Sequence, residues 1–224
     1  LGGFDAYVSS NVLKGSGLSS SAAFEVLIGT ILNHTYNKGV VDAVSIAKIA
    51  QYAENEHFGK PSGVRDQMAS SVGGIITIDF ENTASPIIQK IDFDFTAAGH
   101  RLCIIDVGGN HANLTHEYAA ITTEMKEISN ALGVSYLRQT DYAALLPAIP
   151  ALREQYGDRA VLRALHFFAD NERVEKQSDA LRRGDVDAFL SLTKESGNSS
   201  YRYLQNVYTT KNVGEQGLSL ALCL

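Results

Sequence analysis

A glycine- and serine-rich segment, residues 15–23, has the clearest chemical potential in the sequence. It reads Gly-Ser-Gly-Leu-Ser-Ser-Ser-Ala-Ala and joins an expected strand to an expected helix. The first turn of a helix presents unpaired N–H groups and about half a positive charge to an anion, and small residues let a phosphate approach the backbone. The serine hydroxyls add donors and one candidate Mg²⁺ ligand. The spacing is not that of a P-loop or of a dinucleotide fingerprint, so a small-residue helix start packed on a sheet is an equal alternative.

Two carboxylates, Glu54 and Asp66, flank a break in the pattern at residues 59–63, which contain Pro and Gly. Phosphoryl transfer needs an oxygen ligand for Mg²⁺ and a carboxylate that orients or deprotonates the attacking hydroxyl. Glu54 would serve the first need and Asp66 the second. The alternatives are a solvated glutamate at a helix end and an aspartate that caps a helix or pairs with a cation.

A polar loop that contains His111 and His116 follows an apolar run. The two histidines are five residues apart, which does not match the i, i+4 spacing of metal-binding histidines on a helix. The loop is nevertheless a reasonable wall for a ligand. Tyr118 falls on the apolar face of the next helix, so core packing is the alternative to ligand contact. Arg163 and His166 are interpreted as structural partners on a helix.

The composition excludes several classes of function. The 224 residues carry 19 basic and 25 acidic side chains and a net charge of −6, which argues against binding to nucleic-acid backbones. Charged residues interrupt every apolar run well before the roughly 20 residues that a membrane-spanning helix needs. The first residues lack the features of a signal peptide. Cys103 and Cys223 form no disulfide framework or zinc spacing, and Cys103 is expected to be a buried thiol in a cytoplasmic protein.

The elements that would position these residues follow from hydrophobic periodicity and turn residues. Strands are predicted at 4–13, 75–80, 87–95 and 101–107. Helices are predicted at 19–33, 42–57, about 114–132, 159–183 and from Asp185 onward. Gly184 is expected just after the end of the fourth helix, and residues 97–100 look like a boundary between two halves. The predicted fold class is α+β, with strands mostly in the first half.

Four motifs, in this order, resemble those of the GHMP kinase superfamily, which includes the galactokinases, homoserine kinases, mevalonate kinases and phosphomevalonate kinases. The motifs are residues 17–23, the stretch from Ala53–Glu54 to Gly63–Gln67, residues 163–174 and residues 204–217. More narrowly, the sequence is similar to the galactokinase family over essentially its whole length.

This resemblance implies an ATP-dependent kinase that phosphorylates galactose to galactose 1-phosphate in galactose metabolism, with Mg²⁺ as cofactor. The residues that would surround the ATP phosphates are Gly15, Ser16, Gly17, Leu18, Ser19, Ser20 and Ser21. The metal would be held by Ser21, with Ser20 as the close alternative, and by Glu54. Asp66 would be the catalytic carboxylate facing the sugar O1 hydroxyl, and Gly63, Asp66 and Tyr118 would contact the sugar.

The resemblance also implies the GHMP-kinase two-domain fold, with an N-terminal part like domain 2 of ribosomal protein S5 and a ferredoxin-like C-terminal part. Residues 1–98 would be the C-terminal portion of the first, ATP-binding domain, and residues 99–224 would be the second domain, truncated before its last elements. The family's first and third motifs are not in the sequence, so we expect a fragment with both parts incomplete. The family's Cys-Gly-Ile-Met-Asp-Gln segment reads Ser-Gly-Val-Arg-Asp-Gln here, which places Arg65 beside Asp66.

Three alternatives to a galactose kinase remain at this point. A related enzyme would phosphorylate N-acetylgalactosamine, arabinose or galacturonate. A non-catalytic sensor would bind galactose and ATP on the same scaffold, since fold does not fix function. Finally, the 224 residues alone would be inactive if missing strands left sheet edges unpaired.

Overall fold

The computed structural model of the chain describes residues 2–11, 17–59, 62–108 and 114–224. The predicted site residues Gly15 and Ser16, and also His111, lie outside the described residues. The chain forms two compact units, Leu1–Ile78 and Asp79–Leu224. These are called the first and the second unit below.

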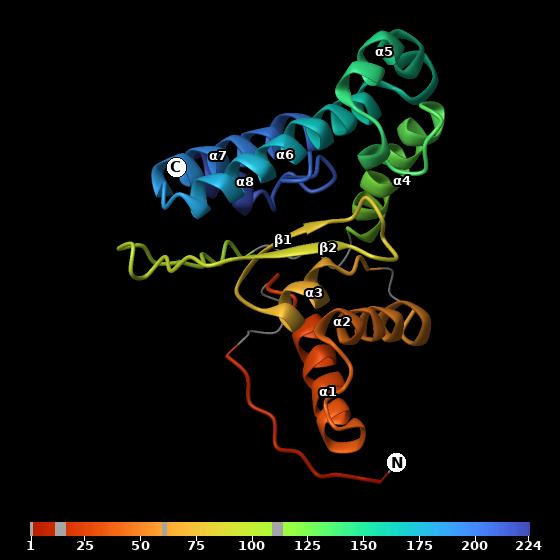
Figure 1. The fold of residues 1–224 in the computed structure, drawn as a ribbon. Helices are drawn as coiled ribbons and strands as arrows, with labels where there is room; N and C mark the ends of the chain where they lie inside the picture. Colours follow the sequence, from red (N-terminus) through yellow and green to blue (C-terminus); the bar gives the residue numbers. More distant parts are fainter. Residues whose placement is uncertain (1, 12–16, 60–61, 109–113) are drawn as a thin grey trace. The chain divides into compact units, whose positions relative to one another are not determined.

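The described helices of the first unit are three α-helices and a π-helix (Figure 1). They are α1 (Ser20–Asn37), α2 (Ala43–Tyr52), the π-helix η1 (Ala53–His57), which directly continues α2, and α3 (Arg65–Val72). Asp42 caps α2 as its sequence position predicts, because its side chain accepts a hydrogen bond from the Ser45 N–H at 2.8 Å. Val26, Ile46 and Ala50 form a buried cluster between α1 and α2.

Close contact between α1 and α2 depends on Gly29. A Cβ atom at this position would lie 3.2 Å from the Ile46 side chain, which is closer than side chains normally pack. The absence of a side chain therefore lets the two helices approach, and α1 is held where its N-terminus can meet α3.

Helices also make up most of the second unit (Figure 1). They are α4 (Thr115–Ala131), the 3₁₀-helix η2 (Leu137–Gln139), α5 (Tyr142–Tyr156), α6 (Asp158–Arg182), α7 (Val186–Ser199), the π-helix η3 (Ser200–Leu204) and α8 (Gly217–Cys223). The long helices α6 and α7 lie side by side.

The turn between α6 and α7 is a Schellman motif, as the position of Gly184 predicts. Gly184 has a φ of +72°, and its N–H donates to the Leu181 carbonyl at 3.0 Å. The N–H of Asp185 donates to the Ala180 carbonyl at 2.8 Å. These bonds satisfy carbonyls at the end of α6, and the Asp185 side chain then caps α7 by accepting from the Ala188 N–H.

One sheet occurs among the described residues, a pair of strands β1 (Ile75–Asp79) and β2 (Ile87–Ile91). These two strands confirm the predictions at 75–80 and 87–95. The strands predicted at 4–13 and 101–107 are wrong for the described residues, because residues 2–11 and 101–108 form no regular element. A strand needs a partner for its N–H and C=O groups, and β1 and β2 pair with each other.

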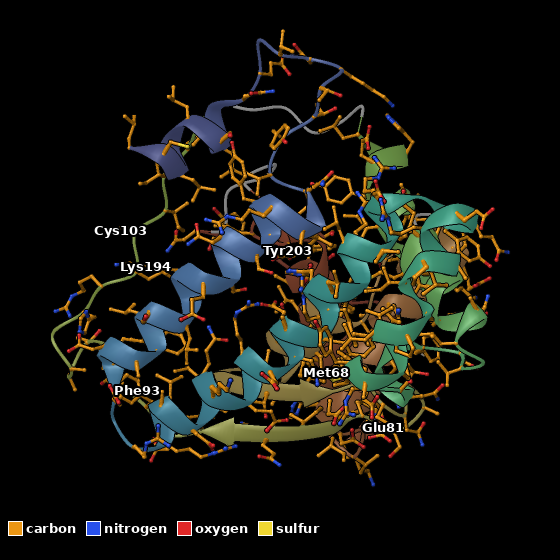
Figure 2. All side chains as sticks on the ribbon, turned by 90° about the horizontal axis from the view of Figure 1, so that it is seen from above. Met68, Glu81, Phe93, Cys103, Lys194 and Tyr203 are labelled. Atoms are coloured by element: carbon orange, nitrogen blue, oxygen red, sulfur yellow. The ribbon has the colours of Figure 1, made fainter. Side chains whose placement is uncertain are left out.

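The segment 101–107 also overturns the prediction of a buried thiol at Cys103. Cys103 is exposed and lies on this extended segment (Figure 2), and the neighbouring Leu102 is 93% exposed. The described chain is therefore mostly helical with a small two-stranded sheet, and both of its described strands lie in the first half of the sequence, as predicted. None of its described helices is both long enough and apolar enough to cross a membrane.

The core of the second unit lies where α4, α5 and α6 meet. Its buried members are Ile128, Leu137, Leu145, Leu152, Ala160, Val161 and Ala164. Leu145 is fully buried in this cluster, whereas its neighbour Leu146 is 46% exposed. The two residues form a matched pair for measuring the contribution of this core.

We expect Leu145→Ala to lower the free energy of unfolding by about 2–5 kcal/mol, because the substitution leaves a cavity in a packed core. Leu146→Ala should lower it by less than about 1 kcal/mol, because its side chain already contacts water. Urea denaturation of both variants measures the difference. Equal losses in the two variants would contradict the assignment of this core.

His166, on α6, is a buried titratable group in the same unit. It is 7% exposed, and its Nδ1 lies 2.9 Å from the Ser199 hydroxyl. Burial lowers the pKa of His166, although Asp170 nearby acts in the opposite direction. The folded state therefore resists protonation of this ring, whereas the unfolded state takes up a proton near the ordinary value of 6.5.

Stability should consequently fall on acidification through about pH 6.5, because the unfolded histidine gains its proton at a higher pH than the folded one. His166→Asn should flatten this slope, even if it changes stability at neutral pH. Urea denaturation at several pH values measures the slope, and the exposed His57→Asn serves as the control that retains it. An unchanged slope in His166→Asn would show that another group carries the pH dependence.

Candidate active site

Two hydrogen bonds bring together four of the residues that the sequence singled out in the first unit. The Ser19 hydroxyl donates to Asp66 Oδ2 at 2.6 Å, and the Ser21 hydroxyl donates to Glu54 Oε1 at 3.1 Å. The serines lie at the start of α1, Glu54 lies on η1 and Asp66 lies on α3. Residues 33 and 47 positions apart in the sequence thus form one polar cluster.

The segment before α1 turns sharply into the helix. Gly17 has a φ of +74°, and Ser19, the N-cap residue, has a φ of +54°, which is uncommon for a residue with a side chain. Within the part of the chain that the structure describes, the N-cap side chain makes no capping hydrogen bond to α1, and Ser20 and Ser21 are the first two residues of the helix. The helix start can therefore receive an anion through backbone N–H groups and hydroxyls. Leu18, also in the predicted loop, is 42% exposed.

Glu54 is buried in spite of its charge. Only 3% of the residue is exposed, so the alternative of a solvated glutamate at a helix end is wrong. Its Oε2 accepts from the Ser62 hydroxyl at 2.7 Å and from the Gln67 side-chain amide at 2.9 Å, while its Oε1 accepts from Ser21. These donors offset the loss of water around the carboxylate. The π-helical turn that carries Glu54 is a rare element that occurs most often at functional sites.

Asp66 is half-buried and lies in the first turn of α3, where the helix dipole favours a negative charge. Its second oxygen, Oδ1, is 3.4 Å from Arg65 Nε. Arg65 therefore points toward the carboxylate, as its position in the sequence suggested, but its side chain is 82% exposed and the pair is screened by water. Gly63 is exposed, and a Cβ atom there would meet nothing within 4 Å.

The donor set fits a small divalent cation. Mg²⁺ prefers oxygen ligands at 2.0–2.1 Å in octahedral geometry, so neighbouring ligands lie about 2.9 Å apart. The 3.1 Å between Ser21 Oγ and Glu54 Oε1 is close to this separation. The described residues contain no group of three or more His, Cys, Asp or Glu side chains suited to a metal ion. A cation here would therefore take most of its ligands from phosphate oxygens and water.

Tyr118 belongs to the second unit, on α4. It is 59% exposed, so the alternative of core packing is wrong. Together with Val107, Arg163 and Tyr208, among others, it lines a cavity of about 220 Å³. The adjacent Glu117 has a pKa below its ordinary value because it accepts a hydrogen bond from Lys211.

Sequence reasoning missed Ser62 and Gln67, which hold the buried carboxylate of Glu54. Ser62 lies in the break at residues 59–63, where a polar residue is ordinary, and Gln67 resembles any polar residue near the start of a helix. The available signal was their position, since both flank Gly63 and Asp66 within a motif that the resemblance had already identified. Their role becomes apparent only from the hydrogen bonds.

Residues 2–74 match the model of the GHMP kinases N terminal domain. Among curated proteins, the galactokinase of Streptomyces coelicolor is 33% identical over 205 residues, which cover 90% of this chain and 51% of the relative. Human galactokinase is 31% identical over 205 residues, which cover 89% of this chain and 49% of the relative. The chain is homologous to the galactokinases of the GHMP kinase superfamily. It spans about half the length of these relatives, and GHMP kinases use ATP.

A solved structure has the same fold as this GHMP kinase homologue. The structure of Lactococcus lactis galactokinase complexed with galactose matches with a TM-score of 0.65. The match covers 89% of this chain and 51% of that chain, at 22% identity. The helical arrangement described above is therefore that of one half of a galactokinase fold.

Ser19 offers a test of the cluster in this GHMP kinase homologue. Its side chain stabilises the fold through the hydrogen bond to Asp66, whereas its left-handed backbone conformation costs stability. Ser19→Ala removes the hydrogen bond to Asp66 and keeps a side chain at positive φ, so it should destabilise the chain by about 1 kcal/mol. Ser19→Gly removes the same bond but relaxes the backbone, so it should cost clearly less. Urea denaturation compares the two variants. If alanine were tolerated as well as glycine, the left-handed conformation of Ser19 would be wrong.

Proposed function

We propose that the chain carries the phosphate, metal and catalytic residues of an ATP-dependent sugar 1-kinase that converts galactose to galactose 1-phosphate. The observation that carries this proposal is the pairing of Ser19 with Asp66 and of Ser21 with Glu54 at the start of α1. A helix N-terminus suited to phosphate stands beside a metal-type carboxylate and a second carboxylate suited to a hydroxyl. This combination fits phosphoryl transfer, in which catalysis is mostly positioning and charge stabilisation.

In the proposed mechanism, residues 15–21 bind the ATP phosphates through the loop and the first turn of α1. Ser21 and Glu54 would hold Mg²⁺, which supplies neutralisation of phosphate charge when it is bound. Asp66 orients the O1 hydroxyl of the sugar and accepts its proton as the oxygen forms a bond to the γ-phosphorus. The bond between that phosphorus and the bridging oxygen breaks, and ADP leaves. Gly63 and Tyr118 are proposed contacts for the sugar.

The wider assignment follows the same proposal. Residues 1–98 would be part of the ATP-binding domain and residues 99–224 part of a ferredoxin-like second domain, acting in carbohydrate metabolism in the cytoplasm. The galactose bound to the Lactococcus lactis relative favours galactose over N-acetylgalactosamine, arabinose or galacturonate as the acceptor. The burial and hydrogen bonds of Glu54, together with the contact between Ser19 and Asp66, support an enzyme over a sugar sensor.

In the complete protein, Asp66→Asn should abolish galactose-dependent ADP release and leave ATP binding largely intact. The amide keeps an acceptor for Ser19 but cannot take the proton of the attacking hydroxyl, and general-base catalysis typically contributes 10²–10⁴-fold. The assay measures ADP with galactose beside N-acetylgalactosamine and arabinose, and calorimetry measures MgATP binding.

The exposed Asp5→Asn, in the same unit, is the control and should keep the wild-type rate. Normal turnover by Asp66→Asn would remove Asp66 from the mechanism. If the complete wild-type protein bound MgATP but turned over no sugar, the sensor alternative would replace the kinase.

A further inference from the structure

Gln67, on α3, is buried between two carboxylates. It is 1% exposed, and its side-chain Nε2 donates to Glu54 Oε2 at 2.9 Å and to Glu25 Oε2 at 3.3 Å. This arrangement fixes the orientation of the amide. The opposite orientation would direct the carbonyl oxygen at two carboxylates, where no proton would be available to join them.

The carbonyl oxygen of the same side chain lacks a hydrogen-bond donor among the described residues. This atom, Gln67 Oε1, is buried. An unsatisfied buried acceptor is costly, and methionine would fill the same volume without that cost. This oxygen belongs to the same side-chain amide whose nitrogen donates to Glu54. Its buried position indicates a hydrogen-bond donor that arrives with a ligand.

The hydrogen bonds also determine which side of Glu54 faces a ligand. Its Oε2 is engaged by Ser62 and Gln67, whereas its Oε1 meets Ser21. The carboxylate therefore cannot rotate without breaking two strong bonds. Its Oε1 is the oxygen presented on the side of the α1 start.

We propose that Gln67 is a positioning residue for the cation of the nucleotide. Its amide group holds Glu54 in the orientation that places Oε1 beside Ser21, and its carbonyl oxygen accepts a hydrogen bond from a water molecule of the hydrated ion. Mg²⁺ usually keeps several of its waters in proteins, so such a donor is expected. This inference rests on the metal role assigned to Ser21 and Glu54 under the proposed function.

The test measures metal binding directly, so that it does not depend on turnover. Mn²⁺ serves as the probe, and electron paramagnetic resonance measures its binding to the chain in the presence of a non-hydrolysable ATP analogue. Gln67→Met removes both polar atoms at nearly constant volume. We expect it to weaken Mn²⁺ binding by about tenfold or more, as substitution of residues that orient metal ligands typically does. Its melting temperature should fall, because the buried Glu54 carboxylate loses one donor, so Mn²⁺ affinity is compared at a temperature at which both proteins are folded.

Asn33 provides the matched control. It is another buried amide in the first unit, 7% exposed, and it bonds only to the backbone of Val41 in the contacts that are described, through its Nδ2 at 2.9 Å and its Oδ1 at 3.1 Å. Asn33→Leu should lower the melting temperature and leave Mn²⁺ affinity unchanged. A purely structural Gln67 would behave in the same way.

The outcomes separate this inference from the proposed function. Wild-type affinity for Mn²⁺ in a folded Gln67→Met variant would overturn the role of Gln67 and leave the kinase proposal intact. No binding of Mn²⁺ by the wild-type chain with the nucleotide analogue would overturn the metal site itself. If Gln67→Met failed to fold, Gln67→Leu would be measured in its place, and failure of both to fold would make Gln67 a residue of the fold alone.

Discussion

The first unit depends on the burial of one negative charge, the carboxylate of Glu54. Removing a carboxylate from water costs several kcal/mol even after relaxation, so a residue that is 3% exposed must find donors within the protein. Ser21, Ser62 and Gln67 supply them. These three residues come from the start of α1, the segment before α3 and α3 itself. Satisfying one carboxylate therefore fixes where two helices and a loop meet.

The same constraint extends to Asp66 through the helix start. Ser21, which contacts Glu54, and Ser19, which contacts Asp66, are two residues apart at the beginning of α1. They cannot move independently, because Ser20 and Ser21 already belong to the helix. The left-handed backbone at Ser19 is the local cost of directing one hydroxyl to each carboxylate. A phosphate bound at this helix start would thus meet both groups at a separation that the fold has set in advance.

Much of the fold was predictable because its signals are local. The Gly184 turn, the Asp42 and Asp185 caps and the two strands of the hairpin follow from residue types and short-range spacing. The strands at 4–13 and 101–107 failed for the opposite reason. Their β-branched and apolar residues favour an extended chain, but strand formation depends on a neighbouring strand, and sequence pattern does not report whether one is adjacent.

The site divides in the same way. The motif identified the loop serines, Glu54 and Asp66 as candidates. It did not predict that Glu54 is buried, because this burial arises where α2 continues as the π-helix η1. Ser62 and Gln67 were missed because they donate to Glu54, which lies 8 and 13 residues away in the sequence. Contacts over such separations produce no periodic pattern of residue types. Residue types therefore indicated the chemistry, and only the packing indicated what holds it in place.

A comparison with Arg163 shows why Glu54 is the better candidate for ligand binding. Arg163 is as deeply buried, at 1% exposed, and it binds Glu124 at 2.8 Å and the Leu204 carbonyl at 3.0 Å. Burial lowers its pKa, and Glu124 offsets this effect, so the charge is balanced by an opposite charge within the second unit. Glu54 differs in its position, because it accepts from Ser21 at the start of α1, where first-turn N–H groups can receive an anion. A buried carboxylate beside a helix start lies where a phosphate and its cation would bind together, whereas a buried arginine paired with glutamate holds helices together.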